Sequence, residues 1–172
     1  MIYFEIISLS FVSFHAFLMI IDEFIFHRKR VLPKWERVGH PIDSLFFLIC
    51  FFIVLFFPMN MNSILFFTLF ACISCFIIIK DEGVHLKYCS KYEQYIHALL
   101  FVLHPIILII LFLSWSSFSV SYFPIFEVFK SFFLKLLIYF QFFSATIFLF
   151  YQIVFWNFIF KEAEYVSKRS HK

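Results

Sequence analysis

Residues 95–113 read YIHALLFVLHPIILIILFL, an apolar stretch without any Asp, Glu, Lys or Arg. A transmembrane helix needs about 20 predominantly apolar residues to cross the hydrocarbon core of a bilayer. Inside lipid each backbone polar group must be satisfied within the segment, which favours a helix over an isolated strand. The stretch therefore predicts a membrane-spanning helix, and its histidines, His97 and His104, are polar groups within or beside that span.

Four other stretches have a similar apolar character, and they cover residues 3–21, 41–57, 63–79 and 134–160. The last is long enough to tilt or to extend beyond the bilayer. The composition agrees, because 63% of the 172 residues are hydrophobic and only 2 are Gly. Such a chain has too few polar side chains to cover a water-soluble globule. We expect an all-α integral membrane protein with five transmembrane helices, folded as a single membrane domain over residues 1–172.

Lys and Arg gather in alternate connecting segments. Residues 22–40, 80–94 and 161–172 hold most of them, whereas 58–62 holds none and 114–133 only Lys130. Positively charged loops favour the cytoplasmic side of a membrane. We therefore predict an inner or plasma membrane protein whose N-terminus is outside and whose C-terminus is cytoplasmic. The formal net charge of +3 is too small to indicate nucleic-acid binding.

The outer segment 114–133 is rich in Ser and aromatic residues, including Trp115 and Tyr122. Trp and Tyr favour the interface between lipid and water. Two interpretations stay open for this segment. It is either a helix that lies on the outer membrane surface or a simple connecting loop.

A charged pattern occurs twice, each time between the two members of a pair of spans. Each copy has Asp-Glu, a His three or four residues after the Glu, and then Lys-[Trp/Tyr]-Glu-x-x-x-His. The copies occupy residues 22–40 and 81–97. Internal repeats expose architecture, and parallel repeats can be related by an axis along the membrane normal. We expect two pseudo-repeated helical hairpins, 1–57 and 63–113, in a four-helix bundle, followed by the fifth span and cytoplasmic tail in 134–172.

The repeated residues are types that bind metal ions. Residues three or four apart share a helix face, so each copy can direct carboxylates and imidazoles toward one point. Soluble di-iron and di-manganese bundles use Glu and Glu-x-x-His sets from four helices, and surplus acids orient the histidines. The predicted metal ligands are Glu23, His27, Glu36, His40, Glu82, His85, Glu93 and His97.

His15, His104 and Asp43 extend this cluster. His15 and His104 each lie seven residues from the charged pattern, which is roughly 10 Å along a helix. Ionisable residues at such depth are candidates for a functional site, so we assign the three residues catalytic roles as deep ligands or proton donors. The copies are not identical, because Ser74 and Phe47 occupy the positions that would mirror His15 and His104. The predicted site is therefore asymmetric.

The leading functional hypothesis is a metal-dependent membrane enzyme, a di-iron oxidoreductase that acts on a lipid or another apolar substrate at the cytoplasmic face. It would hold two iron or manganese ions and take electrons from a donor protein. The chain lacks the His-x-x-His-His boxes of membrane desaturases, so no family is indicated.

Other interpretations stay open. One Zn²⁺ held by three ligands would activate water for lipid hydrolysis. A non-enzymatic protein would hold haem between His15 and His104, or would bind or transport metal ions. The same residues can also form a hydrogen-bonded and ion-paired network without any metal.

Overall fold

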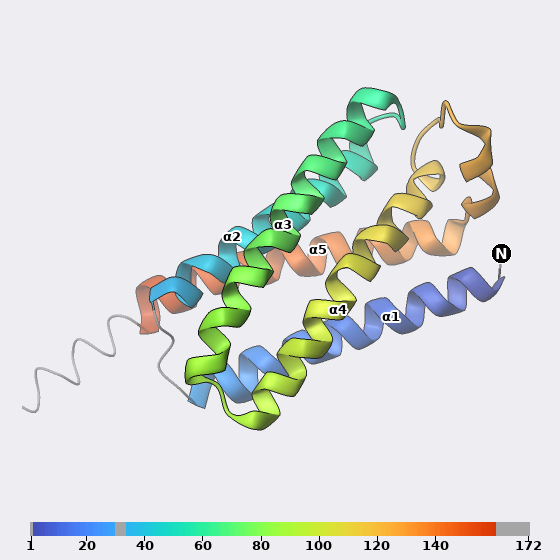
Figure 1. Ribbon diagram of the computed structural model, residues 1–172. Helices are drawn as coiled ribbons and strands as arrows, with labels where there is room; N and C mark the ends of the chain where they lie inside the picture. Colours follow the sequence, from blue (N-terminus) through green and yellow to red (C-terminus); the bar gives the residue numbers. More distant parts are fainter. Residues whose placement is uncertain (1, 30–33, 161–172) are drawn as a thin grey trace, which may run out of the picture.

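The computed structural model describes residues 2–29 and 34–160, and most of these residues belong to long helices (Figure 1). The five long helices are α1 (Ile2–Ile21), α2 (Lys34–Phe56), α3 (Met61–Tyr88), α4 (Lys91–Leu113) and α5 (Phe132–Val154). Each belongs to a helical segment that is long and apolar enough to cross a membrane. The prediction of an all-α chain with five candidate spans is therefore confirmed, and this architecture points to a membrane protein.

Two of the long helices continue into irregular helical turns. Helix α1 passes into the π-helix η1 (Asp22–Phe26) and the 3-10 helix η2 (His27–Lys29), and α5 passes into the π-helix η5 (Phe155–Ile159). The segment between α4 and α5 contains two 3-10 helices, η3 (Ser114–Ser117) and η4 (Pro124–Phe129).

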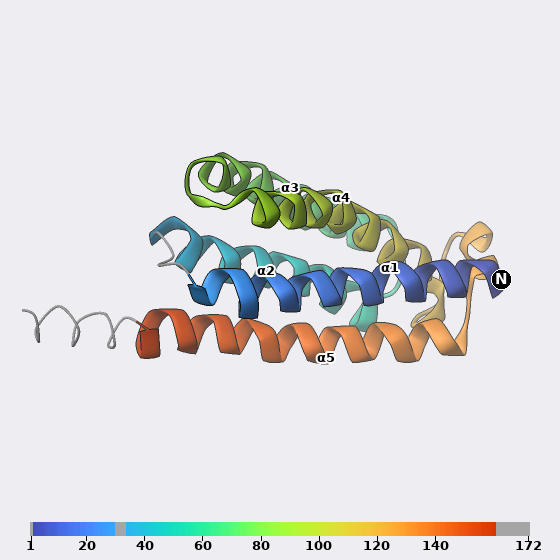
Figure 2. The same cartoon turned by 90° about the horizontal axis from the view of Figure 1, so that it is seen from below.

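The fifth helix packs against two of the first four, α1 and α2. Helix α1 packs chiefly on α4, α2 packs on α3 and α5, and α5 also contacts α1. In Figure 2, α5 runs along α1 and α2 over most of its length, while α3 and α4 lie on the other side of them. Helix α5 is thus part of the helical assembly, alongside α1 and α2. The predicted arrangement of the first four helices as two repeated hairpins stays a prediction.

Apolar packing fixes the end of the bundle away from the charged pattern. Phe51, Val54, Ile107 and Leu111 are fully buried between α2 and α4. Trp115 is buried beside them, and its indole N–H donates to the carbonyl oxygen of Phe57 at 3.0 Å. This core holds one end of the helices together, and the polar side chains described below gather toward the other.

Two helices differ in length from the predicted spans. Helix α2 begins at Lys34, so Pro41 lies inside the helix and not at its first position. Proline has no backbone N–H, which deprives the carbonyl four residues earlier of its helical hydrogen bond. That carbonyl belongs to Arg37, and it accepts a hydrogen bond of 3.5 Å from the Asn157 side chain. Helix α3 continues to Tyr88, so most of the predicted charged turn 80–94 is helical.

Candidate metal centre

The central feature of the charged end is a set of four buried side chains from two parts of the chain. Asp22 and His27 belong to the irregular turns that follow α1, and Glu93 and His97 belong to the start of α4. One ligand atom from each of the four residues lies within 4.8 Å of the others. The set therefore has the residue types, burial and spacing that can hold a metal ion.

The π-helix explains why Asp22 and His27 face the same way. In a regular α-helix, residues five apart differ by about 140° around the axis. In η1 the N–H of His27 instead donates to the carbonyl of Asp22, an i→i+5 bond. The wider turn leaves Asp22 Oδ2 and His27 Nε2 only 3.3 Å apart. Such π-turns are frequent at functional sites.

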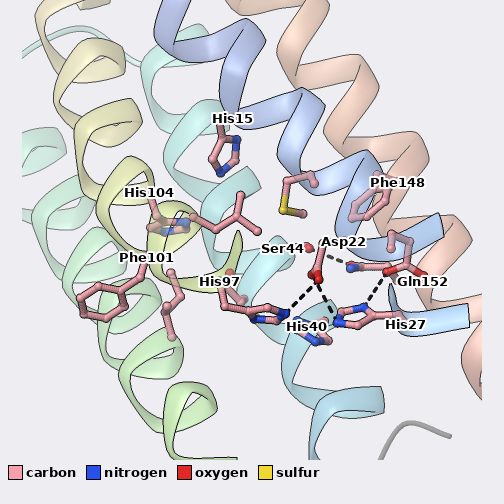
Figure 3. Close-up of a pocket in the computed structure, with 15 residues that line it drawn as sticks. His15, Asp22, His27, His40, Ser44, His97, Phe101, His104, Phe148 and Gln152 are labelled. Atoms are coloured by element: carbon pink, nitrogen blue, oxygen red, sulfur yellow. Dashed lines mark hydrogen bonds and ion pairs between the residues drawn. The ribbon is translucent and has the colours of Figure 1, made fainter. Parts of the chain in front are cut away.

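Asp22 lies at the middle of the set (Figure 3). Its Oδ1 forms an ion pair with His97 Nε2 at 2.9 Å. Two atoms that are each about 2.1 Å from one ion lie roughly 3 Å apart. The close approach of Asp22 and His97 therefore has the spacing of two ligands that share a cation. Glu93 Oε1 is 4.0 Å from His27 Nε2 on another side of the set.

A second ligand set adjoins the first and shares His27 with it. It consists of His27, Glu36 and His40, whose ligand atoms also lie within 4.8 Å of one another. Glu36 is fully buried, and the rings of His27 and His40 have centroids 5.0 Å apart. The predicted contribution of the start of α2 to the cluster is thus present in the structure.

Glu23 lies beside His27 and belongs to neither of the sets found among the described residues. Its Oε2 is 3.4 Å from His27 Nδ1, and its Oε1 accepts a hydrogen bond of 2.6 Å from the indole of Trp156. A carboxylate on the far nitrogen of a metal-binding histidine fixes the ring's orientation and tautomer. The geometry of Glu23 suits this positioning role better than the direct ligation that the sequence predicted.

Glu93 has two structural tasks. It is the third residue of α4 and forms a capping box with Ser90, in which each side chain bonds the backbone N–H of the other residue at 3.4 Å. The capping bond uses Oε2, which leaves Oε1 directed toward His27. One carboxylate can therefore cap α4 and serve the ligand set.

The remaining predicted ligands are Glu82 and His85. Both belong to the last turns of α3, but their side chains lie outside the described residues. Their assignment as ligands stays a prediction.

The predicted catalytic residues line the same polar cavity as the ligand sets. This cavity has a volume of about 70 Å³, and its walls include His15, Asp43 and His104 together with Asp22, His27, His40 and His97 (Figure 3). The rings of His15 and His104 have centroids 6.5 Å apart. Tertiary structure thus brings the deeper residues and Asp22, His27, His40 and His97 of the ligand sets to the walls of one cavity.

Ser74 links two of the catalytic candidates. Its hydroxyl donates to Asp43 Oδ1 at 2.6 Å and lies 3.0 Å from His104 Nε2. Because the Ser74 hydroxyl donates its proton to Asp43, its oxygen is left to accept a hydrogen bond from His104. A proton on His104 Nε2 would therefore complete a hydrogen-bonded chain from His104 through Ser74 to Asp43. The sequence predicts no role for Ser74, although a polar residue within an apolar span is a signal that could identify it.

Helix α5 and its π-turn contribute two residues that the sequence analysis did not assign to the site. Gln152 accepts a hydrogen bond of 2.8 Å from Ser44, and Trp156 donates to Glu23. A tryptophan near the end of a span is usually interpreted as an interfacial anchor. The sequence therefore carries no specific signal for the role of Trp156.

The cluster brings four acidic side chains together in a buried space. The carboxylates of Asp22, Glu23, Glu36 and Glu93 belong to residues that are at most 5% exposed. Removing an ionised carboxylate from water is costly unless an opposite charge compensates. A divalent cation would be the largest local charge in such a site, and it would offset several carboxylates at once.

Comparisons of this chain with protein-family models, with curated proteins and with solved structures found no match. Fold and site alone therefore define its class: a helical protein with five candidate membrane spans and a buried carboxylate–histidine cluster toward one end of the bundle.

Proposed function

We propose that this protein is a metal-dependent integral membrane enzyme that acts on a lipid or another apolar substrate. The observation that supports this proposal is the buried set of Asp22, His27, Glu93 and His97, with ligand atoms within 4.8 Å of one another. Mixed carboxylate and imidazole ligands suit iron, manganese and zinc. The helices that carry the site are long and apolar enough to cross a membrane, which supports an apolar substrate.

Two neighbouring ligand sets favour a pair of iron or manganese ions. Together the sets offer three carboxylates and three imidazoles, and bridging carboxylates commonly hold two such ions close together. We therefore propose di-iron oxidoreductase chemistry as the leading function. This chemistry requires an electron-donor protein, which we expect to approach from the cytoplasmic side.

A zinc-dependent lipid hydrolase is the second candidate, because both sets use His27. An ion that takes His27 for the first set leaves only Glu36 and His40 of the second. A single Zn²⁺ held in the first set would then activate a water molecule for hydrolysis.

We propose that His15, Asp43 and His104 hold or transfer protons beside the bound substrate. They line the cavity that contains the ligand residues, and Ser74 connects Asp43 to His104. A cavity of about 70 Å³ accepts a few water-sized ligands. It suits an ion and its water better than a haem between His15 and His104.

Elemental analysis of the purified protein tests the proposal. After preparation without chelators, we expect about two iron or manganese ions per chain, or one zinc ion for the hydrolase. The double variant Asp22→Asn/His97→Ala should lose the metal, whereas Ser116→Ala, which removes a buried hydroxyl bonded to the Phe126 carbonyl, should retain it. Wild-type metal content near zero, or equal content in all three proteins, would contradict the proposal.

The identity of the metal and the need for oxygen separate the two candidates. An oxidoreductase should consume oxygen when the reduced protein meets its substrate, and it should be inactive without oxygen. A zinc hydrolase should release its products equally well under anaerobic conditions.

A further inference from the structure

A second cavity, larger and more apolar, lies between α1, α2 and α5. It has a volume of about 370 Å³, which is within the range of small-molecule binding sites. Its walls are mainly hydrocarbon and aromatic, and small residues such as Ala16, Ser144 and Ala145 leave room between the helices. None of its lining residues is an Asp, Glu, Lys or Arg.

The apolar cavity adjoins the polar cavity of the metal centre. The two cavities share four wall residues, His15, Met19, Ser44 and Phe148. Figure 3 shows His15, Ser44 and Phe148 among the side chains that line the polar cavity together with the ligand residues. A molecule bound in the apolar cavity can therefore bring one of its atoms next to the proposed reaction site, while the rest of the molecule stays in the apolar cavity.

The apolar cavity also reaches the outer surface of the bundle. Two of its lining residues, Ile20 on α1 and Ile147 on α5, are 55% and 71% exposed. Both helices are candidate membrane spans, so this surface would face lipid chains. A hydrocarbon chain can thus move from the bilayer into the cavity without crossing water.

An exposed arginine lies at the end of the cavity that is nearest the charged pattern. The guanidinium carbon of Arg28 is 4.7 Å from the ring centroid of Phe24, and its Nη2 donates to the hydroxyl of Tyr151 at 3.4 Å. Phe24 and Tyr151 both line the cavity. The planar guanidinium matches the geometry of a carboxylate or a phosphate, so the rim of this apolar cavity carries a group suited to an anionic head.

We propose that the apolar cavity binds a long-chain fatty acid, with its carboxylate on Arg28 and its hydrocarbon chain along α1 and α5. Phe24 lies nine positions after His15, a distance of about 14 Å along a helix. The part of the fatty-acid chain that lies beside the shared wall residues His15 and Met19 is therefore several carbons from the carboxylate. The inference that the fatty acid is the substrate rests on the proposed function. It implies that the reaction takes place at an internal carbon of the fatty-acid chain.

A photoreactive fatty acid with a diazirine in mid-chain tests the binding site in the full-length protein. Peptide mapping after irradiation should locate the label near the shared wall residues on α1 and α5. Ala145→Phe fills the cavity and should lower this labelling at least tenfold. Ala71→Phe, which fills the separate apolar groove between α3 and α4, is the matched control and should leave it unchanged.

The head group is tested with a fatty alcohol probe of the same length. Arg28→Gln should lower labelling by the acid several-fold and should leave labelling by the alcohol unchanged. Equal labelling of wild type and Ala145→Phe, or a label spread evenly over lipid-facing positions of all five helices, would overturn the proposal. If Ala145→Phe does not fold, the smaller Ser144→Leu change provides the same comparison.

Metal content, measured in the same preparations, separates this inference from the proposed function. Specific labelling of metal-free protein would support the fatty-acid site even if the metal centre does not exist. Normal metal content without specific labelling would overturn the fatty-acid site and leave the metal centre standing.

Discussion

The two copies of the charged repeat have the same residue types and different backbones. In the first copy, α1 gives way to a π-helix and a 3-10 helix, and α2 then begins at Lys34. In the second copy, α3 continues as a regular helix to Tyr88 and α4 begins almost at once at Lys91. A repeat in sequence has thus produced two distinct local structures.

This difference determines what each copy contributes to the cluster. The π-turn of the first copy brings Asp22 and His27 to one side. The second copy contributes Glu93 and His97, which share a face of regular helix by their spacing of four residues. The comparison shows that an irregular turn can place a residue, here Asp22, that regular helical spacing would direct elsewhere.

The largest expected effect is a loss of metal affinity when Asp22, the residue positioned by the π-turn, is changed. Asp22→Asn removes the carboxylate that lies 2.9 Å from His97 and 3.3 Å from His27. Loss of even an outer partner commonly lowers metal affinity ~10–100-fold, so we expect this variant to lose at least that much. Titration of the metal-free protein in detergent measures the affinity. Unchanged affinity would show that the π-turn does not build the site.

A second prediction concerns the corresponding acid of the second copy. Glu93→Gln can still form the capping box but removes the ligand charge, so we expect metal affinity to fall ~10-fold or more with little change in thermal stability. Ser90→Ala removes the cap, which costs about 1 kcal/mol, and should leave metal affinity unchanged. If both variants have the same effect on metal binding, the role of Glu93 is capping alone.

A third prediction concerns Trp156, which lies outside both copies of the repeat. Trp156→Phe removes the indole donor to Glu23, which leaves a buried carboxylate oxygen without that bond at a cost of ~1–3 kcal/mol. We expect lower thermal stability and weaker metal binding, because Glu23 orients His27. The control Trp115→Phe also removes an indole hydrogen bond, at the other end of the bundle. It should lower stability while metal affinity stays at the wild-type value.

The smallest expected effect concerns the start of α2 in the first copy. Asn157→Ala removes the donor to the Arg37 carbonyl, and we expect a loss of about 0.5–1.5 kcal/mol. In a Pro41→Ala background the restored backbone N–H can bond that carbonyl, so the same change should cost less. A double-mutant cycle by thermal denaturation measures the coupling, and additive effects would rule out this compensation.

Much of the fold could be predicted because bilayer solvation acts on each segment separately. A run such as 95–113 spans by its own length and polarity, whatever it packs against. Helix ends were predicted less well. At Pro41 the Asn157 side chain bonds the carbonyl that proline leaves without a partner, so α2 begins before the break that the sequence suggests. Helix α3 continues to Tyr88, beyond its predicted end.

The candidate site was predicted in outline. The repeated spacing identified His27, Glu36, His40, Glu93 and His97, which the structure brings into the two ligand sets. It did not reveal the central place of Asp22 or the contribution of Trp156. The first depends on a π-turn and the second on the packing of α5, and neither leaves a periodic signal in the sequence.

The sequence by itself determined five candidate spans and the residue types of the cluster, because both follow from local polarity and helical spacing. Only the tertiary structure decided which of these residues meet, since that depends on how α1, α2, α4 and α5 pack and on one widened turn. The two copies of the repeat have similar local chemistry, and their different neighbours give them different roles.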